Sequence, residues 1–369
     1  MPLTAQVERA RVSQIVFPLE RPFASGIHHI THIRNVVVEF GSGEHVGSGF
    51  TFAFKESHAD AVYELALDMA RSVIGRPTSE VRAVWAALWT GANFVGHEGP
   101  PVMAMSCIDM ALWDLHARVS GLPLHTLLGA GANDWPVYAS GGSLGLDVNE
   151  LCAEALEAQR NHFAGYKFRV GSPAVRDDRI RVAAVREAVG EDFVLMIDAN
   201  QAWSLREAQV ASRQLAEFDL QWLEEPIVAD DIEGLAALRR STEIPLAAGE
   251  TVYGVAGLAE LVRADAVDYL QPDLMRCGGL TPFLDVVALA TDRRVSVMPH
   301  LYSEHSAQLV GLLPPGATIE YLPGWFDHLY GAPPFRDGTL RPAAAPGFSR
   351  DLHPDNLREL CTQSTEVKW

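Results

Sequence analysis

The sequence predicts an α/β protein in which an N-terminal α+β domain is followed by a parallel barrel of alternating strands and helices. The first 130 or so residues contain strand-like segments and then a block of helical patterns. From about residue 135, eight short apolar runs alternate with longer amphipathic stretches. A chain of 369 residues is long enough for a barrel with a companion domain.

The composition is that of a globular protein, with 48% hydrophobic and 21% charged residues. A formal net charge of −18 opposes binding to phosphate backbones, so we expect no nucleic-acid partner. No apolar run approaches the roughly 20 residues of a membrane-spanning helix, so we expect no membrane partner. An acidic surface does not attract anions from a distance. A carboxylate ligand therefore has to be bound by local charges, such as a metal or a few basic side chains.

The four cysteines lie far apart without CxxC spacing, and the first twenty residues lack an export pattern. We therefore expect a cytoplasmic protein with free thiols. We also expect a homo-oligomer whose binding partner is a small molecule.

The N-terminal domain is predicted from two kinds of pattern. Residues 9–19, 34–41 and 47–54 are rich in β-branched and aromatic side chains and are separated by turns rich in Gly, Ser and His, which predicts antiparallel strands. Three helical patterns follow, the clearest in MAMSCIDMALWDLHARVSG, where apolar residues recur at helical spacing before Gly121. We assign residues 1–131 to this domain.

The barrel is expected within residues 132–344. Its strand-like runs are WPVYAS, GYKFRV, FVLMIDAN, LQWLEEP, IPLAAGE, AVDYLQPD, RVSVMPH and ATIEYLP. Each connection between these runs is long enough for a helical crossover. The Pro-rich segment 345–369 contains a short helical pattern, PDNLRELC, but its pattern alone does not place it in either domain.

Polar residues stand at or near the carboxyl ends of the predicted barrel strands. Successive positions from residue 198 onward are 20 to 27 residues apart, which is close to one strand-helix unit. Because a barrel gathers these strand ends at one mouth, where barrel enzymes carry their catalytic groups, we expect the side chains to meet there. They are Lys167, Arg169, Asp198, Glu224, Glu250, Asp273, His300 and Glu320.

Three of these residues, Asp198, Glu224 and Glu250, are acids at the ends of neighbouring apolar strands. Buried acids so close together repel one another unless a cation neutralises them. A hard divalent cation with oxygen ligands fits such a site, and Mg²⁺ is favoured. The alternative is that each acid is a structural cap or an ion-pair partner at its strand end.

Asp273 and His300 lie on the next two strands, so the carboxylate can orient the imidazole and raise its basicity. Such a pair makes a general base that works near neutral pH. The alternative is a structural histidine with satisfied hydrogen bonds.

Lys167 and Arg169 are two residues apart and hence on one side of their strand. They could bind a substrate carboxylate together, one of them could act as a base, or both could form a solvated cationic edge.

The ordered set KFR, DAN, EEP, GE, QPD, PH and IE resembles the mandelate racemase subgroup of the enolase superfamily and spans nearly the whole chain. The segment SCIDMALWDLHARVSGLPLHTLLG is similar to the one that links the capping domain of that family to its barrel. The resemblance implies a (β/α)7β TIM-like barrel with an N-terminal capping domain. It also implies an N-terminal loop over the barrel mouth and a C-terminal tail, here 345–369, that returns to the capping domain.

Carried over residue by residue, the resemblance implies that Asp198, Glu224 and Glu250 bind Mg²⁺ and that Asp273 and His300 form the base dyad. It further implies that Glu320 hydrogen-bonds the substrate carboxylate, that Lys167 helps to bind it, and that Asn200 lies near the α-hydroxyl. His28 and His29, in the loop FASGIHHITHIR, are candidate substrate-binding residues of the covering loop. The same residues could instead form a mobile turn.

One position departs from the family pattern. The second member of the Lys-x-Lys motif is Arg169 here, and a guanidinium does not readily release its proton, so a two-base racemase is disfavoured. We predict α-proton abstraction through an enediolate, with dehydration of an aldonate or aldarate to a 2-keto-3-deoxy acid. The alternatives are a racemase or epimerase of an α-hydroxy or α-amino acid derivative, and a non-catalytic carboxylate-binding barrel. A metal hydrolase is disfavoured because the sequence has no His-rich metal site.

Overall fold

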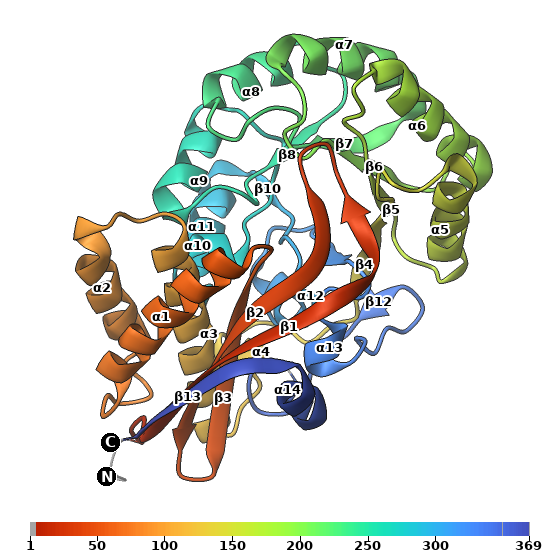
Figure 1. Ribbon diagram of the computed structural model, residues 1–369. Coiled ribbons are helices and arrows are strands. Elements are labelled where there is room, and N and C mark those ends of the chain that lie inside the picture. Colours follow the sequence, from red (N-terminus) through yellow and green to blue (C-terminus); the bar gives the residue numbers. More distant parts are fainter. Residues whose placement is uncertain (1–4, 349, 369) are drawn as a thin grey trace.

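The structure is a computed structural model that describes residues 5–348 and 350–368, and two sheets organise it (Figure 1). The smaller sheet is antiparallel, in the order β13-β1-β2-β3. Three of its strands come from the N-terminus and one from the C-terminus: β1 (Arg9–Ala24), β2 (His29–Ser42), β3 (His45–Ala53) and β13 (Cys361–Lys368).

Helices α1 (Glu56–Val73), α2 (Val81–Gly91) and α3 (Pro100–Val119) follow β3. Helix α3 packs directly on β3 because glycines on the strand leave room for it. A Cβ at Gly47 would lie 2.1 Å from the backbone nitrogen of Leu115. Nearly every side of α3 is buried, since the helix lies between this sheet and the barrel. Two short helices flank α3 in the chain, η1 (Ala92–Phe94) and α4 (Leu124–Leu127).

The larger sheet contains eight parallel strands in the order β10-β9-β8-β7-β6-β5-β4-β11, so the last strand pairs with the first. All eight strand-like runs of the sequence form these strands. They are β4 (Trp135–Gly141), β5 (Tyr166–Arg169), β6 (Leu195–Asp198), β7 (Leu220–Glu224), β8 (Leu246–Ala248), β9 (Tyr269–Leu270), β10 (Ser296–Val297) and β11 (Ile319–Tyr321). The short strand β12 (Thr339–Leu340) pairs antiparallel with β4.

Helices follow the first seven barrel strands and surround the sheet (Figure 1). This arrangement confirms the predicted (β/α)7β barrel with a separate N-terminal α+β domain. The helices are α5 (Val148–Arg160), α6 (Val175–Val189), α7 (Leu205–Leu215), α8 (Ile232–Arg239), α9 (Gly254–Arg263), α10 (Leu274–Cys277) with α11 (Leu280–Arg293), and α12 (Ser303–Leu309). The remaining short helices are η2 (Ala216–Phe218), η3 (Val310–Leu312), α13 (Asp327–Tyr330) and α14 (Pro354–Leu360).

The hairpin of β1 and β2 reaches over the carboxyl ends of the barrel strands (Figure 1). The backbone N–H of Leu144, after β4, donates to the carbonyl of Ala24 at 2.9 Å. Gly26 at the tip touches the loops after β5 and β6, where a Cβ on Gly26 would lie 2.3 Å from the Cβ of Ala202. The absence of a side chain at Gly26 therefore allows the hairpin to lie against the mouth.

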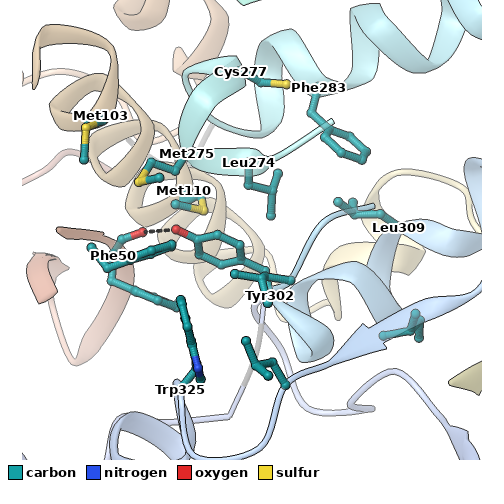
Figure 2. Close-up of a cluster of buried hydrophobic side chains, with 14 of the residues drawn as sticks. Phe50, Met103, Met110, Leu274, Met275, Cys277, Phe283, Tyr302, Leu309 and Trp325 are labelled. Atoms are coloured by element: carbon teal, nitrogen blue, oxygen red, sulfur yellow. Dashed lines mark hydrogen bonds between the residues drawn. The ribbon is translucent and has the colours of Figure 1, made fainter. Parts of the chain in front are cut away.

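A shared hydrophobic core joins the N-terminal domain to the barrel. Figure 2 shows Phe50 of β3 and Met110 of α3 facing Leu274 of α10 and Tyr302 at the start of α12. The Tyr302 hydroxyl donates to the carbonyl of Phe50 at 3.5 Å. Full burial of a large apolar side chain contributes roughly 1.5–3 kcal/mol. This core therefore fixes the hairpin relative to the strand ends that it covers.

The C-terminal segment lies against the N-terminal sheet. Residues of β13 pair antiparallel with β1, from Arg9 with Lys368 to Ile15 with Cys361. The chain therefore crosses from the barrel back to the smaller sheet, and β13 forms one edge of it (Figure 1). Within the described residues, no helix is long and apolar enough to cross a bilayer.

Candidate active site

Three acids from neighbouring strands meet at the barrel mouth under the hairpin. Asp198 ends β6, Glu224 ends β7, and Glu250 follows β8 after Gly249. Each offers a carboxylate oxygen, and these oxygens lie within 4.8 Å of one another. Asp198 and Glu224 are fully buried, and the Glu250 side chain is 11% exposed. The structure thus brings together the three acids that the sequence predicted as metal ligands.

The proximity of these acids is electrostatically unfavourable without a cation. Burial, followed by the charge of Glu224, raises the pKa of Asp198 to about 7. Burial and the charges of neighbouring acids raise the pKa of Glu250 well above its usual range. Three convergent oxygens of this kind match the hard donors that Mg²⁺ prefers. The residues present therefore fit a hard divalent cation, which would relieve the repulsion among them.

Lys167 occupies the other side of this acid cluster. Lys167 is the second residue of β5 and is fully buried. Its ammonium donates to Glu224 and lies 2.8 Å from Glu320 Oε1. Burial opposes its charge, but the two carboxylates outweigh burial and raise the pKa of Lys167 well above its usual range. Burial alone would raise the pKa of Glu320, but the charges of Lys167 and His300 lower it. Lys167 is therefore held as a cation beside an ionised Glu320.

Arg169 lies two residues further along β5 and is 5% exposed. Its Nε lies 3.4 Å from Asp198 Oδ2, and its Nη1 donates to the Ser140 hydroxyl at 2.9 Å. The guanidinium carbon stands 5.0 Å from the centre of the Phe23 ring on the hairpin. Burial opposes the charge, but the charge of Asp198 and the neighbouring glutamates raise the pKa of Arg169. This residue therefore acts as a fixed positive charge between an acid and the covering hairpin.

His300 and Asp273 form the predicted pair. The His300 Nδ1 is 2.6 Å from Asp273 Oδ2, and its Nε2 is 3.1 Å from Glu250 Oε2. Burial opposes the charged ring, but the hydrogen bond to Asp273 and the charges of Glu320 and Asp273 raise the pKa of His300. The next residues, Leu301 and Tyr302, both have φ of 49°, an unfavourable left-handed backbone. The chain thus turns sharply just after the imidazole.

Asn200 and the two hairpin histidines occupy different places. The Asn200 amide Nδ2 donates to Asp198 Oδ2 at 2.9 Å, and its Oδ1 is buried without a partner among the described residues. That oxygen can accept a hydrogen bond from a ligand hydroxyl. His28 and His29 are exposed near the hairpin tip, and no described hydrogen bond joins their side chains to the acids. Burial and the charge of Arg276 lower the pKa of His28.

The sequence reasoning missed several residues that hold the acids. Gln271 Nε2 and Trp222 Nε1 both donate to Glu224 Oε2, at 2.6 and 2.9 Å. Alternation along a strand is the signal that could have found Trp222, because it precedes Glu224 by two residues and shares its side. Glu225, Gln201 and Thr251 form a second set of contacts behind the acids, and no periodic pattern marks them.

The fold and the charged mouth define a capped barrel that carries a carboxylate site and an acid-base pair. Residues 8–129 match the mandelate racemase/muconate lactonizing enzyme N-terminal domain, and residues 147–356 match the enolase C-terminal domain-like family. The chain therefore belongs to the mandelate racemase/muconate lactonizing enzyme family of the enolase superfamily, and it is an enzyme.

Several relatives are similar over most of their length. The L-talarate/galactarate dehydratase of Salmonella typhimurium is 32% identical over 345 residues, which are 91% of this chain and 86% of the relative. Its crystal structure with Mg and L-lyxarohydroxamate has a TM-score of 0.93 and 30% identity and covers 99% of this chain and 95% of that one. The 3,6-anhydro-alpha-L-galactonate cycloisomerase of Streptomyces coelicolor is 30% identical, over 96% of this chain and 99% of the relative.

Proposed function

We propose that this enzyme is a Mg²⁺-dependent dehydratase that converts a sugar acid, an aldonate or an aldarate, to a 2-keto-3-deoxy acid. The asymmetry of the mouth supports this proposal most. One side carries the His300–Asp273 pair, with the imidazole Nε2 directed at the acid cluster. Strand β5 carries Lys167 and Arg169, and neighbouring carboxylates hold both as cations. A mouth with one competent base suits elimination of water.

Asp198, Glu224 and Glu250 would hold the metal ion. When bound, Mg²⁺ supplies Lewis-acid stabilisation of negative charge on the substrate carboxylate. The ammonium of Lys167 stabilises the same carboxylate, because positive charge placed where negative charge develops lowers the barrier to proton removal. Glu320 would hydrogen-bond the substrate carboxylate in its protonated form, since two ionised carboxylates cannot share a hydrogen bond. The unpartnered Oδ1 of Asn200 accepts a hydrogen bond from the α-hydroxyl.

Elimination then uses His300 twice. The imidazole Nε2 takes the α-proton, while Asp273 holds Nδ1 and stabilises the charged ring. The resulting imidazolium returns a proton to the departing 3-hydroxyl, which leaves as water. Arg169 contributes charge at the mouth and can bind a polar or anionic distal part of the substrate. His28 and His29 stand at the rim, where they can contact that distal part.

Two other activities make different demands on the same site. A racemase or epimerase needs a second base opposite His300, and a lysine with a raised pKa or an arginine is a poor base. A non-catalytic carboxylate-binding barrel needs no His–Asp pair.

We further propose that the enzyme works in the cytoplasm as a homo-oligomer on a small carboxylate. Its four cysteines are free, as expected in a reducing compartment.

The direct test is a panel of aldonates and aldarates incubated with purified protein and Mg²⁺. We expect a 2-keto acid from at least one of them, loss of activity with a chelator, and recovery when Mg²⁺ is restored. Turnover that is indifferent to the chelator would contradict the metal requirement. A panel that yields epimerised acid sugars and no 2-keto acid would favour the racemase or epimerase.

The metal site has its own test in Glu224→Gln. The amide oxygen can still accept from Trp222 and Gln271, which both donate to Oε2, whereas the bond from Lys167 to Oε1 is lost. Because the amide keeps the size and two of the hydrogen bonds of Glu224, we expect the fold to survive. Loss of the central negative charge should abolish Mg²⁺ binding and activity. Circular dichroism checks the fold, and titration calorimetry measures the binding. Normal turnover by this variant would show that the metal assignment is wrong.

A further inference from the structure

We propose that Glu225 is a positioning residue that sets the spacing of the three metal-binding acids by tying together the loops that carry them. The inference deepens the proposed function, since it takes Asp198, Glu224 and Glu250 as the metal ligands. It does not depend on which acid sugar is the substrate.

Glu225 follows Glu224 directly and is 2% exposed. Its backbone is fixed on both sides: its N–H donates to the carbonyl of Ala247 in β8 at 3.0 Å, and its carbonyl accepts from the N–H of Gln201 at 2.7 Å. The residue thus links the ends of β6, β7 and β8 through its main chain.

The side chain repeats the same connection. The amide Nε2 of Gln201 donates to Glu225 Oε2 at 2.9 Å, and the hydroxyl of Thr251 donates to Glu225 Oε1. Gln201 stands three residues after Asp198, and Thr251 stands directly after Glu250. The Glu225 carboxylate therefore connects the loop after Asp198 to the loop after Glu250.

The orientation of Gln201 is itself fixed. Its Oε1 accepts from the N–H of Ala229 at 3.0 Å, so its Nε2 must face Glu225 and Thr251. The distance from Gln201 Nε2 to the Thr251 hydroxyl is 3.2 Å. Both oxygens of Glu225 already have donors. The carboxylate is therefore used within the loops, whereas the neighbouring Glu224 takes part in the acid cluster.

The backbone here needs such support. Asn200, Gln201 and Glu225 have φ of 43°, 63° and 36°, and side chains other than Gly rarely adopt this left-handed region. Strained residues of this kind persist only when their surroundings overdetermine them. Without the contacts of Glu225, the loop after β6 is free to relax, and Asp198 moves with it. The expected cost is weaker binding of a cation that requires defined oxygen positions.

The test compares Mg²⁺ binding by substrate-free proteins. Replacing a residue that orients the metal ligands without binding the metal itself lowers metal affinity by about 10-fold to 100-fold. We expect that loss for Glu225→Ala and for Thr251→Val, measured by titration calorimetry, together with a smaller rise in melting temperature on addition of Mg²⁺. Thr251→Ser keeps the hydroxyl and should bind Mg²⁺ close to the wild-type level. If Glu225→Ala fails to fold, the Mg²⁺ affinities of Thr251→Val and Thr251→Ser test the proposal, and equal affinities would contradict it.

Asp109, on α3 of the N-terminal domain, provides a matched control outside the acid cluster. It is also a buried carboxylate that accepts from a threonine, with contacts of 2.6 Å to the Thr281 hydroxyl and 2.9 Å to the Thr281 N–H. Asp109→Ala should lower the melting temperature and leave Mg²⁺ affinity unchanged. If Glu225→Ala behaves in the same way, Glu225 is merely structural and the proposal is overturned. If the wild-type protein binds no Mg²⁺, the metal site and this inference fall together. Inactivity on sugar acids with intact Mg²⁺ binding affects only the proposed function.

Discussion

Single residues of one chemical type have different roles at this mouth because their partners differ. Asp198 faces Arg169, Glu224 is held by Lys167, and Glu250 faces His300. Burial raises the pKa of Asp198 and Glu250, whereas the charge of Lys167 overcomes burial and lowers the pKa of Glu224. Glu224 is therefore the acid most firmly kept as an anion in the absence of a metal.

The role of His300 as the base can be tested by His300→Asn. The replacement keeps a side chain that can hydrogen-bond Asp273 but removes the basic nitrogen. We expect exchange of the substrate α-proton with deuterated solvent to stop, as followed by NMR or mass spectrometry of recovered substrate. Asp198, Glu224 and Glu250 are unchanged in this variant, so Mg²⁺ affinity should change little. Exchange at the normal rate would assign the base to the Lys167 side.

Arg169→Lys separates elimination from racemisation. A lysine cannot make both the Ser140 hydrogen bond and the contact with Asp198, so we expect slower elimination, with kcat/KM lower by roughly tenfold to a hundredfold. The lysine also restores the two-lysine motif, so the variant can gain α-proton exchange on the opposite face. Wild type incubated with one enantiomer in deuterated water should return unracemised substrate. Deuterium with inverted configuration in the wild-type reaction would contradict a one-base mechanism.

Among the secondary-structure elements, the hairpin of β1 and β2 has the closest relation to the site. Its side chain Phe23 lies over Arg169 and packs edge-on against Trp325, with ring centres 5.7 Å apart. Its tip touches Ala202 and thus the loop that follows Asp198. The hairpin therefore covers the mouth and also restrains one of the loops that form it.

Gly26→Val tests the close approach at the hairpin tip. A Cβ there would lie 2.3 Å from the Cβ of Ala202 and 3.2 Å from the carbonyl of Gly171, so the hairpin has to move away. Overpacking of this kind costs about 1–3 kcal/mol. We expect KM to rise several-fold and the hairpin to become more susceptible to limited proteolysis. An unaltered KM would show that the tip does not shape the mouth.

Elements with a strong apolar pattern were predicted well from the sequence, and those held by contacts with residues far away in the chain were not. Each barrel strand is a short apolar run ending in a polar residue, so its position and its strand-end acid could both be inferred. Strand β13 has the polar sequence CTQSTEVK and is mostly exposed, so only its hydrogen bonds to β1 make it a strand. The expected strand 9–19 also continues to Ala24, because pairing with β2 resumes after a bulge beyond Pro18.

The sequence predicts the site residues that recur at strand ends, but it does not predict contacts between residues in different loops. Asp198, Glu224 and Glu250 recur with the period of the fold, so the sequence points to them. Gln201 and Thr251 lie in loops, and their meeting at Glu225 depends on the closure of three separate turns. No local pattern carries that information.

At the scale of the whole molecule, histidines that full or partial burial keeps neutral link stability to pH. Burial lowers the pKa of both His305 and His328 from 6.5 to about 3. The unfolded chain binds protons on these rings below pH 6.5, whereas the folded protein does not until about pH 3. Their contribution to stability is therefore fully present above pH 6.5 and is lost as the pH falls from 6.5 toward 3.

His305→Gln should make the free energy of unfolding less dependent on pH in this window. Each such histidine contributes a slope of about 1.4 kcal/mol per pH unit, so one ring accounts for roughly 2 kcal/mol between pH 6.5 and 5. Urea denaturation at several pH values measures the slope. His58→Gln, which changes an exposed histidine, is the control and should keep the wild-type dependence. Equal slopes for the His305 variant and wild type would contradict the buried neutral ring.

The pairing of β13 with β1 has a consequence for biosynthesis. Arg11 on β1 and Glu366 on β13 are hydrogen-bonded although 355 residues separate them in the chain. At 5–20 residues per second, a ribosome needs roughly 20 to 70 seconds to add that length. During that time the outer edge of β1 has no partner strand and can pair with the edge of another nascent chain. On a polysome, where several copies emerge side by side, β1 is therefore the segment at which we expect misassembly, and chaperone binding, to begin.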